Sequence, residues 1–380
     1  MRFARPAPAG VLLVTILAAA CGSDPRSDAP LALDAASATR DASGFVVVAS
    51  NAVTGNALLL FPRQHDGSLG TPMAFPTGGN GTGGGLGNQG GLALAGDRWI
   101  LAVNAGSNDV SAFARRGGHL TLADRESSGG EQPVSVAAWG RLVYVLNARG
   151  GGNITGFRLR HDGDLVPIPG STRPLSAANP GPAQIGFAPD GRHLVVTEKA
   201  TNTITLYDVG LDGIAGPPQP RESVGKTPFG FAFDERAHLL VSEAFGGATD
   251  ASALSSYRIG RQDRLVTLSG SVATTETAAC WVAVSPDGRF AYVTNTGSGS
   301  VSGYRVHPRG RLSLLDPDGV TGQTDAGPID LAFAQGGRLL YTLNGGSHSI
   351  SGFEVRSDGG LSAFPAGGEV PVGANGMVAW

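Results

Sequence analysis

The chain has 380 residues. A single hydrophobic core usually stops growing at about 250–300 residues, so several domains or a repeating architecture are expected. Glycine accounts for 59 of the 380 residues, which is about 16%, against a usual share of roughly 7%. The net charge of −3, without a basic stripe, argues against a nucleic-acid partner, and the hydrophobic share of 41% excludes a disordered chain. Glycine without a G-X-Y period excludes collagen and predicts many short strands joined by tight turns.

Residues 1–20 have the features of a signal peptide. Arg2 and Arg5 precede an apolar run, 11–20, that is shorter than the roughly 20 residues of a membrane-spanning helix. Small residues before Cys21 resemble a bacterial lipobox, so we expect Cys21 to be lipidated and residues 21–43 to include a flexible tether. The chain is then exported and held at the cell envelope, periplasmic or outer-membrane side, only by its lipid anchor. A plain secretory signal with an incidental cysteine is the alternative.

From residue 44 to residue 380, one β-rich unit of about 48 residues recurs seven times. Each unit contains an apolar run that ends in Asn or Glu, a polar turn and a second run, and hairpin turns such as Pro189-Asp190-Gly191 precede most copies. Such units predict an all-β, seven-bladed β-propeller with four-stranded antiparallel blades. The first unit starts at its second strand and 373–380 is a lone first strand, so we expect the C-terminal strand to join the N-terminal blade and close the ring.

Antiparallel pairing places the start of each first strand and the end of each second strand on one rim. In the fourth unit, Pro182 and Glu198 are equidistant from the hairpin turn and are predicted to pair. First strands are innermost, so their opening positions are expected to surround the central funnel. These positions are Gly91, Ser135, Gln184, Gly230, Trp281, Asp330 and Gly376.

The second strands end in Asn in five units and in Glu198 and Glu243 in the other two. The asparagines are interpreted as structural, because Asx side chains bond their own turns. The two glutamates and Asp330 are predicted to form an acidic cluster at the rim that acts as general base or holds a cation, with Lys199 as charge partner. Solvated or salt-bridged rim carboxylates are the alternative.

Four residues on this rim are candidates for ligand binding: Gln184, Trp281, Lys199 and Ser135. Cys280, next to Trp281, has no base placed near it by the sequence and is interpreted as a buried inert thiol. The Gly-rich run 77–91 lacks a phosphate-loop pattern and is interpreted as a long flexible connection.

The repeats in 87–113, 182–204, 227–247 and 277–304 resemble the bacterial lactonase-family seven-bladed propellers, which are named after 6-phosphogluconolactonase and the fungal carboxymuconate-lactonizing enzyme. The resemblance covers residues 44–380. It implies lactone hydrolysis or formation, with Glu243 matching a glutamate of the enzymes. The enzymes' His-x-His and Gly-Pro-Arg-His motifs are replaced by 181–184 (GPAQ) and 226–229 (KTPF), which puts a phosphorylated substrate in doubt.

Two functions therefore remain open. The first is a lactonase of a small uncharged metabolite at the envelope, with Glu243 as base or acid and Glu198 and Asp330 assisting. The second is a non-catalytic propeller that binds a ligand in its central funnel or a protein partner. We expect a monomer without a cofactor. The scattered histidines and two cysteines predict no metal site, although a structural calcium ion is left open.

Overall fold

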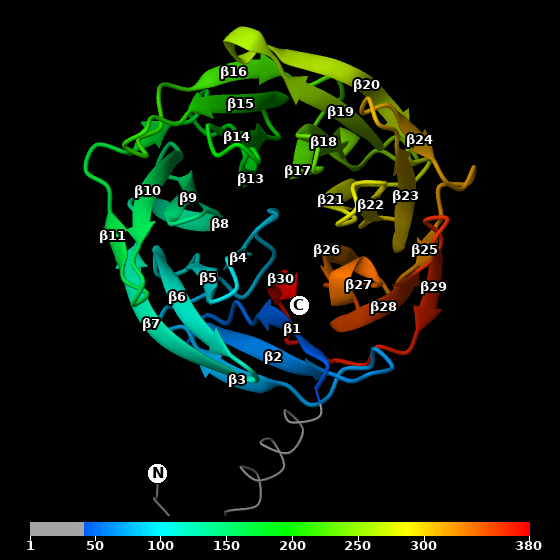
Figure 1. Cartoon of the computed structure of the whole chain (residues 1–380), viewed down its shortest axis with the longest axis horizontal. Helices are drawn as coiled ribbons and strands as arrows, with labels where there is room; N and C mark the ends of the chain where they lie inside the picture. Colours follow the sequence, from blue (N-terminus) through cyan, green and yellow to red (C-terminus); the bar gives the residue numbers. More distant parts are fainter. Residues whose placement is uncertain (1–41) are drawn as a thin grey trace, which may run out of the picture.

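The computed structural model describes residues 42–380, which form seven sheets arranged as a ring around a central axis (Figure 1). This confirms the predicted all-β, seven-bladed propeller. In the described part of the chain the only helical segments are three short 3-10 turns, and no helix is long and apolar enough to cross a membrane. The predicted signal peptide, Cys21 and nearly all of the tether lie outside the described residues. The turns are η1 (Phe245–Gly247), η2 (Arg261–Asp263) and η3 (Gln335–Gly337).

Blades 1 to 3 come from the N-terminal half and from the last strand of the chain. In blade 3 a two-residue strand, β12, pairs with β10 at its outer edge, next to β11 along the strand. From the axis outward the strands are β30 (Asn375–Ala379), β1 (Gly44–Ala49), β2 (Ala57–Arg63) and β3 (Met73–Pro76) in blade 1; β4 (Leu92–Ala95), β5 (Trp99–Asn104), β6 (Asp109–Arg116) and β7 (His119–Ser127) in blade 2; and β8 (Glu131–Trp139), β9 (Leu142–Arg149), β10 (Asn153–Leu159), β11 (Leu165–Pro167) and β12 (Arg173–Pro174) in blade 3.

Blades 4 to 7 follow in chain order, and blade 6 has a short outer strand, β25, like that of blade 3. Their strands are β13 (Pro182–Phe187), β14 (His193–Glu198), β15 (Thr203–Asp208) and β16 (Gln219–Glu222); β17 (Pro228–Phe233), β18 (His238–Glu243), β19 (Ala253–Ile259) and β20 (Leu265–Ala273); β21 (Ala279–Val284), β22 (Phe290–Asn295), β23 (Ser300–Val306), β24 (Leu312–Leu314) and β25 (Gly322–Gln323); and β26 (Pro328–Ala334), β27 (Leu339–Asn344), β28 (Ser349–Val355) and β29 (Leu361–Phe364).

The ring closes through the C-terminal strand, as predicted. β30 pairs antiparallel with β1, with Val378 opposite Val47, and becomes the innermost strand of blade 1. Figure 1 shows β30, in red, beside the blue β1 near the centre of the ring. Blade 1 thus joins the two ends of the described chain, and the inner edge of β1 is paired with β30.

The hydrophobic core lies between neighbouring blades because side chains alternate along each strand. In β14, Leu194 and Val196 pack toward blade 3, whereas Val195 packs toward blade 5. The hairpin that precedes β14 turns at Gly191, whose φ of +68° suits glycine in a tight turn. Each middle strand is therefore buried on both faces, which explains the continuous apolar runs in the sequence.

The predicted strand register is confirmed. Pro182 pairs with Glu198, and a bulge follows before Gln184 pairs with Thr197. The same bulge occurs in blades 3, 6 and 7, just before Ser135, Trp281 and Asp330. These polar and aromatic residues therefore occupy equivalent places at the start of the inner strands.

Candidate functional site

Glu198, at the end of β14, is buried inside blade 4, one strand away from the central axis. Its Oε1 accepts hydrogen bonds from the Ser176 amide (3.1 Å) and the Thr205 hydroxyl (3.0 Å). Its Oε2 accepts from the hydroxyls of Ser176 and Thr201, the latter at 3.2 Å. The carboxylate ties the loop that enters the blade to β15 and the turn before it.

Glu243, at the end of β18, has the equivalent place in blade 5 and is also fully buried. Its Oε1 accepts from the Gly225 amide (2.9 Å) and from the hydroxyls of Ser255 (2.5 Å) and Tyr257 (3.4 Å). Its Oε2 accepts from the Ser271 hydroxyl at 2.6 Å. A side chain at Gly225 would collide with this carboxylate, so the glycine allows the close approach.

The asparagines at the same position make the same kind of contact. Asn295 donates to the hydroxyls of Ser300 and Ser302 at 3.0 and 2.9 Å, and Asn344 donates to Ser349 and Ser351 at 3.2 and 2.8 Å. We predicted bonds to their own turns, but in blades 2, 3, 6 and 7 the side chains reach the adjacent strand. In blades 2 to 7 the strand-end position is therefore a buried polar junction between the second and third strands. Asn51 of blade 1 differs, because its side chain donates to Thr82, Gly84 and Gly373.

Asp330, at the start of β26, is separate from both glutamates. One carboxylate oxygen accepts from the Leu331 amide (2.8 Å) and the other from the Met377 amide of β30 (3.0 Å). Burial raises the pKa of this carboxyl to about 7, against the effect of the two amides. The three acids that we expected to cluster make no contact with one another, and each is held by its own blade or blade junction.

Ser135 and Gln184 link inner strands of neighbouring blades. Ser135 Oγ accepts from the Ile185 amide at 3.2 Å, and the Gln184 side chain bonds both the amide and the carbonyl of Phe231, at 2.6 and 3.0 Å. These polar groups at the predicted funnel positions are therefore engaged in holding adjacent blades together.

The Gly-rich connection between blades 1 and 2 enters the centre of the ring, where Figure 1 shows it running into the opening ahead of β4. The Asn88 side-chain amide donates to the Val134 carbonyl and its oxygen accepts from Asn375 at 3.0 Å. The Asn88 backbone carbonyl accepts from the Trp281 indole at 2.8 Å. This connection, which we predicted to be flexible, is bonded to blades 1, 3 and 6.

Gln89 extends the same crossing. Its side chain bonds both the amide and the carbonyl of Val282 at 3.0 and 2.8 Å, and its backbone amide donates to the Ala183 carbonyl at 3.0 Å. Gly90 accepts from the Val136 amide at 2.8 Å. We call residues 87–91 the crossing segment, because they contact the inner strands of several blades.

Lys199 lies beside the crossing segment. Its Nζ donates to the carbonyls of Gly87 and Pro182, the latter at 3.4 Å, and lies 4.8 Å from the centre of the Phe229 ring. Phe229 in turn packs against Trp281, with ring centres 4.9 Å apart. Burial lowers the pKa of Lys199 to about 8, so its neutral amine is accessible near physiological pH.

Cys280 is free and buried, as the sequence predicted, and it lies near Lys199, which the sequence did not show. Burial raises the pKa of its thiol to about 12, which suits an inert packing role. Lys199, Phe229, Trp281 and Cys280 come from blades 4, 5 and 6 and form the group that we call the lysine cluster. Phe229 and the crossing segment were not predicted for this site, because no sequence pattern places the loop in the funnel.

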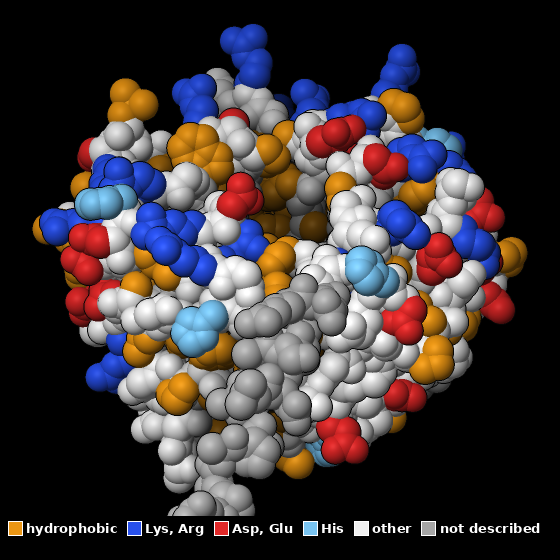
Figure 2. Space-filling model, turned by 60° about the horizontal axis from the view of Figure 1, so that its bottom comes forward, with side chains coloured by type: hydrophobic (Ala, Val, Ile, Leu, Met, Phe, Trp, Pro, Cys, Tyr) orange, Lys and Arg blue, Asp and Glu red, His pale blue; other side chains and the backbone are white. Residues whose placement is uncertain are grey.

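A hollow lies near the centre of the face shown in Figure 2, with hydrophobic side chains inside it and charged side chains around it. Elsewhere, on the rim opposite Lys199, His193 lies close to two aspartates, Asp208 and Asp263. Among residues 42–380 these three are the side chains that could share a metal ion. No other described group of His, Cys, Asp and Glu offers that geometry.

The family described as "Lactonase, 7-bladed beta-propeller" matches residues 91–380, which is most of the ring. The chain belongs to this family. No curated protein matches its sequence.

Solved structures show the same fold at low sequence identity. A periplasmic gluconolactonase of Pseudomonas aeruginosa is 18% identical, with a TM-score of 0.71 over 88% of this chain and 98% of that one. Putative 6-phosphogluconolactonases of Bacteroides uniformis and Bacteroides fragilis are each 19% identical over 89% of this chain, and 99% and 98% of theirs, with TM-scores of 0.68 and 0.64. These structures share the fold of this chain, and its activity has to be argued from the residues of its own site.

Proposed function

We propose that this lactonase-family propeller hydrolyses a small uncharged lactone at the cell envelope, with Lys199 as general base. The observation that carries the proposal is the desolvated amine of Lys199 beside the aromatic wall of Phe229 and Trp281. The neutral amine would take a proton from water as the water adds to the lactone carbonyl. The ring C–O bond then breaks, and the proton passes to the leaving alkoxide, giving a hydroxy acid.

The uncharged substrate follows from the residues around the lysine cluster. The stretches that correspond to the enzymes' His-x-His and Gly-Pro-Arg-His motifs, 181–184 and 226–229, contain neither histidine nor arginine, and the opening positions of the inner strands include none either. A phosphate group would therefore lack the paired cations that usually bind it. The sugar lactones named for the structural neighbours make glucono-1,5-lactone and its 6-phosphate a matched pair of test substrates.

Glu198 and Glu243 have a different role in this proposal. Each accepts four hydrogen bonds inside its blade, so we assign proton transfer to Lys199 and a structural role to the glutamates. The proposal includes the export and the lipidation at Cys21 that the sequence predicts, which would supply the chain with an unphosphorylated lactone outside the cytoplasm.

The test is turnover of the two gluconolactones by the purified chain, followed by proton release. We expect faster hydrolysis of the unphosphorylated lactone and a rate that rises through pH 8, as Lys199 loses its proton. Lys199→Met should lower kcat by about 100-fold or more. Lys226→Met is the matched control, because Lys226 is the other of the two lysines and is exposed.

A wild-type rate no higher than buffer hydrolysis would count against catalysis. It would favour the second function, a non-catalytic propeller that binds a ligand or protein. One observation supports that alternative: the crossing segment is hydrogen-bonded across the centre of the ring, where a substrate would have to enter. Retained turnover in Lys199→Met would support lactonase activity but would show that another residue acts as the general base.

A further inference from the structure

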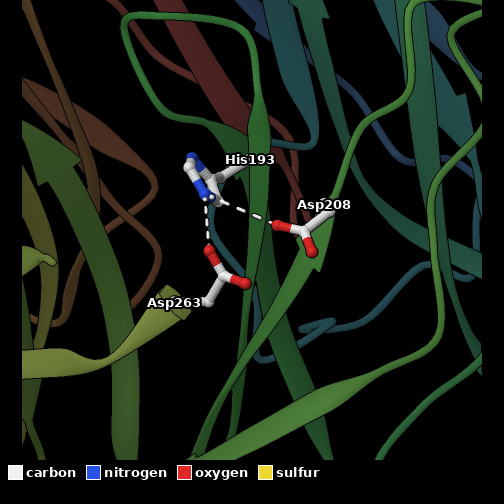
Figure 3. Close-up of side chains that lie close together, drawn as sticks. All are labelled: His193, Asp208 and Asp263. Carbon is white, nitrogen blue, oxygen red and sulfur yellow. Dashed lines mark hydrogen bonds and ion pairs between the residues drawn. The ribbon is translucent and has the colours of Figure 1, made fainter. Parts of the chain in front are cut away.

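His193, Asp208 and Asp263 converge at the junction of blades 4 and 5 (Figure 3). His193 begins β14 and Asp208 ends β15, so antiparallel pairing sets them opposite each other. Asp263 comes from η2, which connects β19 to β20 in blade 5. The Nε2 atom of His193 lies 3.1 Å from Asp263 Oδ1 and 3.5 Å from Asp208 Oδ1.

Gln219, on the outer strand β16, holds the far side of both carboxylates. Its Nε2 donates to Asp208 Oδ2 at 3.0 Å and to Asp263 Oδ2 at 3.3 Å. Arg221 fixes Gln219 in turn by donating to its Oε1 at 2.9 Å. The outer carboxylate oxygens are thus engaged, and the inner ones are left facing the imidazole.

The second imidazole nitrogen is also oriented. His193 Nδ1 lies 3.7 Å from Asp190 Oδ1, so a third carboxylate lies behind the imidazole, and a metal ion at Nε2 would replace the proton that Nε2 shares with Asp263. Metal-binding histidines commonly have such a carboxylate behind them. The arrangement provides both the ligand atoms and the residues that orient them.

The two carboxylates of this cluster favour the binding of a cation. Within residues 42–380, neither Asp208 nor Asp263 forms an ion pair with lysine or arginine, and their ionic partner is His193. Two adjacent carboxylates repel each other unless a positive charge lies between them. The side chains of His193, Asp263 and Asp208 are 18%, 24% and 54% exposed, so an ion can reach them from solvent.

We propose that His193 Nε2, Asp208 Oδ1 and Asp263 Oδ1 form a binding site for a divalent transition-metal cation, with Zn²⁺ as the best match, that ties blade 4 to blade 5. Imidazole nitrogen and carboxylate oxygen are ordinary zinc ligands, and tetrahedral bonds of about 2.1 Å separate ligand atoms by roughly 3.4 Å. The observed separations of 3.1 and 3.5 Å fit that geometry with small side-chain rotations. Water completes the coordination on the exposed side of Asp208.

The test is isothermal titration calorimetry of the full chain with ZnCl₂ at pH 7.5, after removal of metal with EDTA. We expect one Zn²⁺ per chain, and binding that weakens as the pH is lowered, because protons compete with the metal for its ligand atoms. His193→Ala should abolish this binding. Gln219→Ala should weaken it by about 10–100-fold, because that residue only orients the ligands. His161→Ala, at an exposed histidine in blade 3, is the control and should bind as the wild type does.

Thermal unfolding gives a second readout. Zn²⁺ should raise the Tm of the wild type and of His161→Ala and leave that of His193→Ala unchanged. Asp263→Asn serves as a second ligand variant if His193→Ala does not fold. No binding by the wild type, or undiminished binding by folded His193→Ala and Asp263→Asn, would overturn the proposal. So would NMR showing both nitrogens of His193 protonated at pH 7.5 and insensitive to Zn²⁺, since the cluster would then be an ion pair with imidazolium.

Discussion

Blades 4 and 5 differ from blades 2, 3, 6 and 7 at the end of the second strand, where glutamate replaces asparagine. Both residue types tie the second strand to the third, the glutamate by accepting hydrogen bonds and Asn295 by donating them. Glu243 gathers four donors, whereas Asn295 donates to two serines and leaves its Oδ1 without a hydrogen-bond partner among the described residues. A residue that departs from a repeat pattern is therefore not necessarily catalytic, because the hydrogen-bonding groups around it can differ from those of the other repeats as well.

The largest expected effect is that of Glu243→Ala. Removing the carboxylate leaves the Gly225 amide and several hydroxyls buried without an acceptor, and it opens a cavity. We expect the free energy of unfolding to fall by about 3–5 kcal/mol. Asn295→Ala should cost only about 1–2 kcal/mol by the same reasoning. Urea unfolding followed by circular dichroism measures both, and equal losses would contradict the contrast between the two residue types.

Asp330 extends the comparison to a buried carboxyl group that accepts only two hydrogen bonds, against four for each glutamate. Its folded pKa of about 7 lies above its ordinary value of 3.8, so the folded state binds the proton more tightly. Stability should therefore fall as pH rises from about 4 to about 7, by about 3 kcal/mol. The wild-type curve minus that of Asp330→Asn isolates this effect. A difference curve that is flat or rises over this range would show that burial does not govern this group.

Glu198→Asn converts blade 4 to the pattern of the asparagine blades. The shorter side chain cannot reach all four donors, so Ser176 and Thr201 lose an acceptor. We expect a loss of about 1–2 kcal/mol in the free energy of unfolding, measured in urea. A variant as stable as the wild type would mean that water replaces the carboxylate oxygens.

The smallest expected effect is that of Gln89→Ala in the crossing segment. It removes two hydrogen bonds to Val282 at a partly solvated position, for a loss of about 1 kcal/mol. Amide hydrogen exchange should show faster exchange at Val282, whose amide loses its acceptor. Unchanged exchange there would indicate that the crossing segment contributes little to the order of the inner ring.

Much of the fold could be predicted from the sequence, because each blade is set by local patterns. Runs that end in Asn or Glu, together with Pro-Asp-Gly turns, fix both the strands and their register, and the pairing of Pro182 with Glu198 followed from distance to the turn alone. Closure was predictable because the first unit lacks a first strand and the last segment supplies one.

The site was less predictable, since it depends on contacts between distant segments. Gln89 contacts Val282 across the ring, and Asp263 of blade 5 contacts His193 of the neighbouring blade 4. No spacing in the sequence shows either contact. The repeat pattern placed Glu198 and Glu243 correctly at the ends of their strands, but it could not show which hydrogen-bond donors surround them. The catalytic role that the sequence predicted for them and for Asp330 has not been tested, and our proposal gives the glutamates a structural role instead.

Closure by β30 has a consequence for the order in which the ring can form. β1 is made first and β30 last, yet β1 needs Val378 and its neighbours as a partner. Until the last strand arrives, the leading strand keeps one side open to any other extended chain, which favours aggregation. If the chain is threaded through a membrane N-terminus first, the ring cannot be sealed until its tail has crossed. Completion of the fold would then wait until β30, the last of the described strands, had crossed.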